Sequence, residues 1–464
     1  MPSLLTEKQR TELNRTVLSY LATTRGVSKE DVRRIQEELA PDEAELLESE
    51  EEMQRQGQIL EKKWTSVVRL QRKVLDLESQ IANLKLELEN AGPGRKKNAD
   101  PLNWLPRLPA KYSLSGHRQP ITAIAFHSVF SVIASASEDG SIKIWDWELG
   151  ELERTIKGHT KSVVDIDFGG PLDEILLASC SSDLSIKLWD PQNDYANIKT
   201  LTGHDHTISS VRFTPQGTHL LSASRDCTVR IWDVKSGYAV RTIHGHSEWV
   251  KTVAPSLDGQ FVLSAGIDQS ARIASFLTGE GKLAFIGHEH VIEHAIFAPK
   301  QANPFLAALE GLKEPIESAF SHSFDYIATA SRDKTIKIWN ARQEVVKTLV
   351  GHDNWVRQLA FHPSGKYLIS VSDDKSIRCW DLSQMGRCVK TIPDAHNHFI
   401  SCIRWAPEIS SVNDDQSSST NEQPPPPNNN NDTNDSSNGA LSKKNTIRCV
   451  LATGSVDLDV KIWL

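Results

Sequence analysis

Residues 222–232 read Ser222-Ala223-Ser224-Arg225-Asp226-Cys227-Thr228-Val229-Arg230-Ile231-Trp232, and Gly203-His204 stand ahead of them. The aspartate of this stretch has a hydroxyl residue four positions before it and a tryptophan six positions after it. From Thr228 to Trp232, polar and apolar residues alternate as they do in a half-buried β-strand. We therefore expect a strand that begins directly after a tight turn carrying the aspartate.

The same pattern occurs seven times, which predicts an all-β propeller of seven four-stranded blades over residues 110–464. Most neighbouring copies lie about 42–45 residues apart, the period of one such blade. The histidines are His117, His159, His204, His246, His288, His352 and His396, the last preceded by Ala395 instead of glycine. The aspartates are Asp139, Asp183, Asp226, Asp268, Asp333, Asp374 and Asp457. The hydroxyl residues are Ser135, Ser179, Ser222, Ser264, Thr329, Ser370 and Thr453. The tryptophans are Trp145, Trp189, Trp232, Trp339, Trp380 and Trp463, and Ala274 takes this place in the fourth copy.

This repeat resembles that of the WD-repeat family. The resemblance implies that the His, Ser or Thr, Asp and Trp of each blade form a buried hydrogen-bond chain, so that the repeated residues are structural. A hydrolase triad is the other interpretation, but a nucleophile needs one exposed serine beside an oxyanion hole, not seven equivalent hydroxyls on strands. A phosphate-binding glycine loop is also missing from the sequence. We expect no catalytic residue, no metal site and no cofactor.

The two ends of the repeat region predict how the ring closes. The chain stops at Lys461-Ile462-Trp463-Leu464, and the place of these residues in the repeat predicts the third strand of the last blade. The fourth strand must then come from Lys111-Tyr112-Ser113-Leu114, ahead of the first histidine. Two blades are longer than the others, with an added loop within about 299–319 and a Pro- and Asn-rich insertion at about 408–446 that we expect to be disordered.

Composition excludes several classes of function. The net charge of −8 argues against general nucleic-acid binding, which needs a basic surface. No apolar stretch approaches the roughly 18–20 residues that span a bilayer, and the N-terminus lacks the pattern of a secretory signal. The six cysteines are scattered, which is typical of reduced thiols inside cells. We expect a soluble intracellular protein that neither enters membranes nor binds nucleic acid.

The N-terminal third predicts a homodimer. Residues 53–90 follow a heptad pattern, in which β-branched residues at position a and leucine at position d favour a parallel two-stranded coiled coil. The a and d residues of its regular part are Val67, Leu70, Val74, Leu77, Ile81 and Leu84. A single amphipathic helix packed on the propeller is the alternative. Residues 91–109 are expected to form a linker, because Gly92-Pro93-Gly94 ends the helix.

Residues 1–40 resemble the LisH motif, a small helical dimerisation module. The apolar residues that share one face of its first helix are Leu13, Val17, Tyr20 and Leu21. The match is partial, since Val27 replaces the aromatic residue that usually follows the glycine. The predicted fold is thus an all-β propeller preceded by a helical LisH-like module and a coiled coil.

The whole chain resembles the lissencephaly/nuclear-distribution F family, the fungal form in particular. That resemblance implies a non-catalytic dimeric regulator of cytoplasmic dynein, which supports nuclear migration, spindle positioning and the targeting of dynein to microtubule plus ends. The implied partners are the dynein heavy chain, a NudE-type coiled-coil protein and, indirectly, the plus-end machinery, in the cytoplasm and at spindle poles. A nuclear WD-repeat scaffold of a transcription complex is the alternative.

A basic and aromatic surface is expected on one propeller face. The turn carrying the blade aspartate and the loop carrying the blade histidine lie on the same face, and the residues beside them there are Arg225, Trp249, Lys251, Arg332, Trp355, Arg357 and Lys375. Arginine and tryptophan are frequent interface hot spots. The alternative is that the tryptophans pack only between blades. The resemblance implies motor contacts for Arg225, Arg332, Trp355 and Lys375, and places Lys251 where the family has an arginine.

Overall fold

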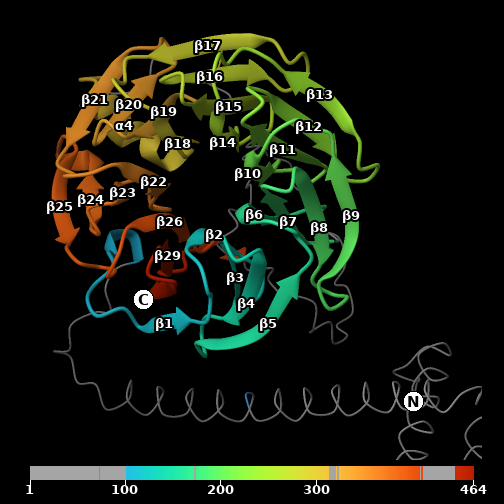
Figure 1. Ribbon diagram of the computed structural model, residues 1–464. Helices are drawn as coiled ribbons and strands as arrows, with labels where there is room; N and C mark the ends of the chain where they lie inside the picture. The colour runs from blue at the N-terminus through green and yellow to red at the C-terminus, as the bar shows by residue number, and fades with distance from the viewer. Residues whose placement is uncertain are drawn as a thin grey trace, which may run out of the picture. The chain divides into compact units, whose positions relative to one another are not determined.

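The structure, a computed structural model, describes residues 101–171, 174–312, 320, 323–407, 409–410 and 445–464, and only Lys73 from the region before them. In this part of the chain, seven antiparallel four-stranded sheets stand around a central axis (Figure 1). The predicted seven-bladed propeller is confirmed. The LisH-like module, the coiled coil and most of the insertion at 408–446 lie outside the described residues.

Each blade consists of four strands, named here from the axis outward. Blades one to four consist of β2 (Ile121–Phe126), β3 (Val132–Ser137), β4 (Ser141–Asp146) and β5 (Glu151–Lys157); β6 (Val163–Gly169), β7 (Leu176–Ser181), β8 (Ser185–Asp190) and β9 (Ala196–Thr202); β10 (Ile208–Phe213), β11 (His219–Ser224), β12 (Val229–Asp233) and β13 (Ala239–Ile243); and β14 (Val250–Pro255), β15 (Phe261–Gly266), β16 (Ser270–Ser275) and β17 (Gly281–Ile286). Blades five to seven consist of β18 (Ile292–Phe297), β19 (Tyr326–Ser331), β20 (Thr335–Asn340) and β21 (Val345–Val350); β22 (Val356–Phe361), β23 (Tyr367–Ser372), β24 (Ile377–Asp381) and β25 (Arg387–Ile392); and β26 (Ile400–Trp405), β29 (Leu451–Ser455), β30 (Asp459–Trp463) and β1 (Tyr112–Ser115).

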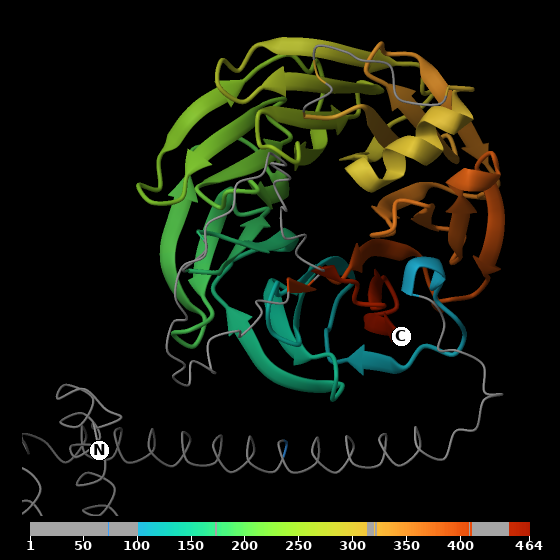
Figure 2. The same ribbon diagram turned by 180° about the vertical axis from the view of Figure 1, so that it is seen from behind.

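The apolar core lies between neighbouring blades. Middle strands bury both of their faces against the blades beside them, and β4 buries all of its residues. Outer strands such as β5 bury little and carry charged residues. The first strands of successive blades contact one another around the axis, which Figure 2 shows from the opposite side. Burial on both faces explains why the second strands, such as β3 and β7, are nearly continuous apolar or small-residue runs, whereas each third strand keeps one lysine or arginine.

Blade seven closes the ring with strands from both ends of the propeller sequence. β1 pairs antiparallel with β30, so that Tyr112 faces Ile462 and Leu114 faces Val460. The side chains of Leu114, Val460 and Ile462 are buried in one apolar cluster with residues of blade one. The predicted closure is confirmed, and it leaves no blade with an unpaired third strand.

The seven repeated constellations form the predicted hydrogen-bond chain. In each blade, histidine Nδ1 lies 2.6–3.2 Å from the aspartate carboxylate and Nε2 lies 2.7–2.8 Å from the Ser or Thr oxygen. In six blades the tryptophan Nε1 donates to the same hydroxyl oxygen at 2.8–3.0 Å. An indole N–H can only donate, so the hydroxyl oxygen accepts it; a histidine with its proton on Nδ1 would donate to the aspartate and accept the hydroxyl proton at Nε2.

Hydrogen bonding fixes the charge of the blade aspartates. Burial alone would raise the pKa of these carboxyls, but side-chain and backbone donors, the histidine among them, outweigh it. The pKa falls to about 2 in Asp139, Asp183, Asp268 and Asp457, and lies below its usual value in the other three blades as well. The aspartates are therefore ionised acceptors that hold the turns in place.

The two longer blades differ from the sequence expectation in detail. Where a loop was expected after residue 299, the structure has a short turn, η2 (Lys300–Ala302), and a helix, α4 (Asn303–Leu309). Leu306 of this helix is fully buried and packs with Leu382 of η3 (Leu382–Gln384), in blade six. In blade seven, β27 (Ile409–Ser410) pairs with β28 (Asn445–Thr446), so the ends of the insertion lie side by side.

The residues just ahead of β1 pack on the propeller. The turn η1 (Pro101–Asn103) leads to Trp104, whose ring lies 5.3 Å from that of Trp405 in an edge-to-face arrangement. Trp104 and Leu105 pack against the apolar cluster between blades six and seven. Of the expected linker 91–109, the described part thus lies against the blades. Among the described residues, no helix is long and apolar enough to cross a membrane.

Candidate docking surface on one propeller face

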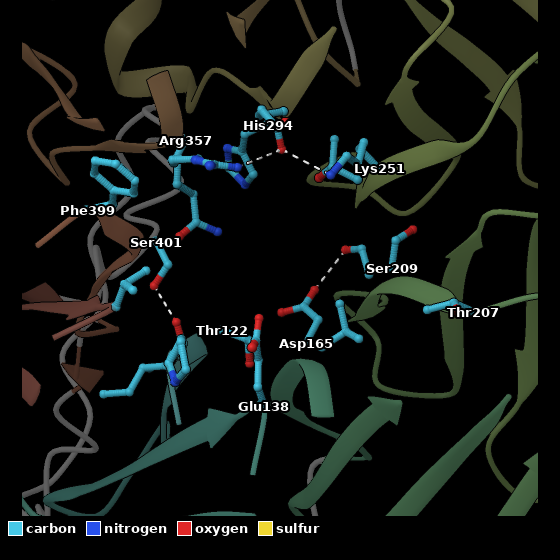
Figure 3. A pocket seen from close by; sticks show the side chains of 18 of the residues that line it. Thr122, Glu138, Asp165, Thr207, Ser209, Lys251, His294, Arg357, Phe399 and Ser401 are labelled. Atoms are coloured by element: carbon cyan, nitrogen blue, oxygen red, sulfur yellow. Dashed lines mark hydrogen bonds and ion pairs between the residues drawn. The ribbon is translucent and has the colours of Figure 1, made fainter. Parts of the chain in front are cut away.

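One position of every blade is placed at the mouth of the central channel by a β-bulge. The pairing of the first strand with the second shifts register one residue after the first strand begins. The bulged residues, here called the bulge ring, are Thr122, Val164, Ser209, Lys251, Glu293, Arg357 and Ser401. They line a cavity of about 330 Å³ to which all seven blades contribute (Figure 3). A β-bulge changes the direction in which the side chain of the bulged residue points, and every blade has such a bulge at this position.

A second set of positions lies beside the bulge ring. The residues directly before the blade aspartates, here called the turn ring, are Glu138, Ser182, Arg225, Ile267, Arg332, Asp373 and Val456. In every blade, the N–H of this residue donates to the carbonyl two positions before the bulge, at 2.9–3.0 Å. This bond explains how residues 16–55 positions apart in sequence come together on one face, as the sequence predicted.

The bulge ring contains three hydroxyl residues, three charged residues in successive blades, here called the charged sector, and the apolar Val164 of blade two. Thr122 donates to the carbonyl of Val163 in the next blade at 2.8 Å, and Ser209 and Ser401 make the equivalent bond to their own next blades. In blades four, five and six the position is charged, as Lys251, Glu293 and Arg357. The charged sector therefore replaces blade-to-blade hydroxyl bonds by ion pairs.

Glu293 is the centre of this charged sector. Its carboxylate lies 3.3 Å from Lys251 Nζ and 3.7 Å from Arg357 Nη1, and it accepts a hydrogen bond from Arg332 Nε. Its side chain is only 8% exposed, against 22–26% for the three cations. Arg357 is also held in a fork by Asp373, at 2.7 and 2.8 Å. The two carboxylates fix the cations at the cavity mouth with part of each still open to solvent.

The charged groups shift one another's ionisation. Burial would raise the pKa of Glu293, but Lys251, Arg357 and Arg332 together hold it below its usual value. Burial lowers the pKa of Lys251, with repulsion from Arg332 and Arg357 adding to the effect, and Glu293 opposes both. Without the neighbouring carboxylate, Lys251 would lose its proton more readily at this buried position. Glu293 therefore helps to keep Lys251 positively charged.

Two tryptophans, the exposed Trp249 and the half-buried Trp355, each stack with an arginine of the neighbouring blade. The Arg225 guanidinium of blade three lies 4.7 Å from the centre of the Trp249 ring of blade four. The Trp355 ring of blade six lies 4.2 Å from the guanidinium of Arg332, in blade five, and 5.0 Å from that of Arg357. Trp249 is 38% exposed, so it does more than fill space between blades. Stacked, planar guanidinium groups lose little freedom when a partner binds.

The predicted surface is thus assembled in two parts. Lys251, Arg332, Trp355 and Arg357 meet around Glu293, while Arg225 and Trp249 form a separate pair toward blade three. Lys375 follows Asp374 in the blade-six turn, at φ 66°, and no ion pair joins its side chain to a carboxylate of the described residues.

Two members of the site escaped the sequence reasoning, Glu293 and Asp373. Both are carboxylates, whereas the sequence predicts this surface from its basic and aromatic residues. Aligning the seven copies at the second residue of the first strand would have exposed the run Lys251, Glu293 and Arg357 in successive blades. The signal lay in comparing blades, not in any local motif.

In four blades the serine of the Ser-His-Asp chain is closed to substrate. Ser135, Ser179, Ser222 and Ser370 are completely buried, and each already accepts an indole N–H. A nucleophilic serine needs access to substrate and a free oxygen lone pair. In the described part of the chain, no group of three His, Cys, Asp or Glu side chains is placed to hold a metal ion.

Known proteins resemble this chain over its whole length. The family described as "WD domain, G-beta repeat" matches residues 109–146, 150–190, 196–233, 237–274, 306–340 and 343–381. A nuclear distribution protein PAC1 of Coccidioides posadasii is 52% identical over 478 aligned positions, which cover 100% of both chains. Proteins of the same name from Gibberella zeae and Arthroderma otae are each 49% identical, again over 100% of both chains.

Proposed function

Since the chain belongs to the WD-repeat family of nuclear distribution PAC1 proteins, we propose that it is a non-catalytic, dimeric regulator of cytoplasmic dynein. It acts in nuclear migration and spindle positioning and in bringing dynein to microtubule plus ends. The basic and aromatic surface of blades three to six docks on the dynein motor domain. The observation that carries this proposal is the set of cations that Glu293 and Asp373 hold, partly exposed, around Trp355.

The chemistry of this surface favours an acidic partner. Arg332, Arg357 and Lys251 are held in place before binding, so a partner carboxylate that displaces their water meets fixed donors. Trp249 and Trp355 supply apolar area beside those donors, a combination typical of hot spots. A complementary acidic patch on the motor also speeds encounter, since opposite potentials steer association.

Docking changes motor behaviour only if it discriminates between motor conformations. A ligand that binds one state better shifts the population toward that state by its difference in affinity. Two propellers joined through the predicted N-terminal dimer raise avidity by about 10²–10⁴ where both can engage. A NudE-type coiled-coil protein is the second partner, and the protein works in the cytoplasm, at plus ends and at spindle poles.

The test is binding of the purified full-length protein to a purified dynein motor domain. We expect the change of Arg225, Arg332 and Lys375 to alanine together to weaken binding by about a hundredfold or more, because hot-spot truncations each cost roughly 2 kcal/mol or more. The matched control changes Lys157, Lys235 and Lys300 to alanine, which removes the same charge from exposed positions elsewhere on the propeller. Binding by wild type and control but not by the folded triple variant is the expected result.

Other results separate the parts of the proposal. Equal binding by all three proteins would leave the dynein function standing and overturn this docking surface. Failure of wild type to bind would favour a nuclear scaffold, and imaging the tagged protein decides that case. Signal at microtubule tips fits the dynein regulator, whereas diffuse nuclear signal fits the scaffold.

A further inference from the structure

Blade four lacks one side chain that the other six blades share. Ala274 in β16 pairs with Val262, at the position where Trp145 in β4 pairs with Ile133. In blade one the indole lies over the glycine before the histidine, and a Cβ placed on Gly116 would come within 3.3 Å of the Trp145 ring. A Cβ placed on Gly245 would meet only the Arg272 side chain, at 3.5 Å. The volume that the indole fills in the other blades is therefore left open in blade four.

A cavity of about 340 Å³ occupies this position. Its apolar wall comes from Val229 and Ile243 of blade three and from Ala274 and Leu283 of blade four, and its polar wall includes His246 and Ser264. The His246 side chain is 5% exposed, against at most 1% for the other six blade histidines. Ser264 is likewise 5% exposed, whereas its six equivalents are all 0% exposed. Solvent thus reaches groups that an indole covers elsewhere.

The cavity also contains an acceptor without its usual donor. Ser264 Oγ lies 2.8 Å from His246 Nε2 and 3.5 Å from the Arg272 carbonyl oxygen. In the other blades the same oxygen accepts an indole N–H at 2.8–3.0 Å. No described residue donates to Ser264 Oγ in that direction. A ligand with one N–H at the edge of a flat apolar ring matches both the shape and this acceptor.

The mouth of the cavity favours an aromatic guest. The Arg272 side chain lies at the edge of the cavity and is 37% exposed. The exposed residues His244 and Lys282 also line this edge. A guanidinium beside a ring face is attracted by the ring's quadrupole. Arg272 is partly held by Ser270 and Asp268, at 3.2 and 3.9 Å. It can therefore cover a guest without a large loss of side-chain freedom.

We propose that the blade-four cavity binds an indole ring, which takes the place of the missing tryptophan and donates its N–H to Ser264 Oγ. The six filled blades provide the template for this pose. Apolar cavities left by missing large side chains bind aromatic molecules of matching size. The ring can arrive as a small indole compound or as the tryptophan side chain of a partner, and both present the same chemistry to the cavity.

The experiment titrates full-length protein with indole, 1-methylindole and N-acetyl-L-tryptophanamide by calorimetry and ligand-detected NMR. We expect saturable binding of indole, roughly two- to tenfold tighter than 1-methylindole, which lacks the N–H. Ala274→Trp fills the cavity from within and should abolish binding. Ser264→Ala should retain binding but lose the preference for indole. Saturable binding of the amide as well assigns the site to a partner's side chain, and binding of indole alone assigns it to a free compound.

Two controls keep the outcome decisive. Ala274→Phe fills the same space without an N–H, so it replaces Ala274→Trp if the larger side chain prevents folding. Ser222→Ala, in the filled blade three, should leave indole binding unchanged. No saturable binding of indole to wild type, or equal binding to a folded variant with the cavity filled, would overturn the proposal.

Discussion

At the scale of single residues, the most consequential side chain of the surface is a carboxylate. Glu293 is the only anion of the bulge ring, and it lies among three cations that come from three successive blades. Without it, Lys251, Arg332 and Arg357 would repel one another at a partly buried position. Removing one partner of a buried ionic cluster costs more than the cluster contributes, because the remaining charges stay desolvated.

Glu293→Gln should therefore lower the free energy of unfolding by about 2–4 kcal/mol at neutral pH. The pKa of Glu293 lies below its usual value in the folded protein, so its contribution is complete above the unfolded pKa near 4.5 and is lost as the pH falls below it. The difference between wild type and variant, measured by urea unfolding from pH 7 to pH 3, should shrink below pH 4.5. Glu289→Gln, an exposed change in the same blade, should have no such effect, and an equal loss in both variants would refute this role.

The residues that the sequence predicted best are those that recur from blade to blade. His117, Asp139 and Ser135 have equivalents in all seven blades and Trp145 has equivalents in all but blade four, so their contacts could be predicted from the sequence. Glu293 and Asp373 could not be found in this way, since their role depends on which charges the neighbouring blades supply. That information is spread over three copies of the repeat, so it lies in the comparison of blades and not in the sequence of any one blade.

At the scale of secondary-structure elements, closure depends on the pairing of β1 with β30. β30 also supplies Trp463, whose Nε1 donates to Thr453, and it begins two residues after Asp457, which holds His396. Removing β30 thus leaves β1 without a partner and breaks the hydrogen-bond chain of blade seven. The damage reaches blade one, because Leu114 shares an apolar cluster with Ile124 and Trp145.

Deletion of residues 455–464 should abolish the cooperative thermal unfolding of the propeller. Circular dichroism and calorimetry on the purified protein would report a lost or strongly lowered transition. A deletion of equal length within the Pro- and Asn-rich insertion, residues 421–430, should leave the transition temperature within a few degrees of wild type. A truncated protein that melts as wild type does would show that β30 is dispensable.

Elements outside the repeat were harder to predict than the strands. Strand positions follow from period and alternation, whereas α4 is seven residues long and begins with a proline near its N-terminus. So short a helix has little intrinsic stability, and its structure derives from the burial of Leu306 and Leu309 against blades five and six. Tertiary packing that decides an element cannot be read from the element's own sequence.

At the scale of the whole molecule, the proposed action on dynein would depend on how many propellers bind together. The predicted coiled coil at residues 53–90 would join two copies, and the second contact would then benefit from a high effective concentration. The six strongest heptad positions include Leu77 at d, while Ser79 falls at the outward position f of the same heptad.

Leu77→Glu should convert the protein from dimer to monomer in analytical ultracentrifugation, because a charge at d would be buried in the dimer seam. Apparent affinity for a surface coated with dynein motors should fall by roughly 10²–10⁴, and affinity for a single motor in solution should not change. Ser79→Glu introduces the same charge on the outer face and should leave both measurements as in wild type. A Leu77→Glu protein that remains dimeric would contradict the heptad assignment.

The pairing of β1 with β30 also determines when the propeller can close during translation. β1 leaves the ribosome early, yet its partner β30 is made some 350 residues later, which takes roughly 20–70 s at about 5–20 residues per second. Throughout that interval the nascent chain carries an unpaired strand edge, the feature that other chains pair with most readily. The ring cannot be completed before β30 has been made, so a chain that terminates ahead of β30 is an open arc with an exposed strand edge.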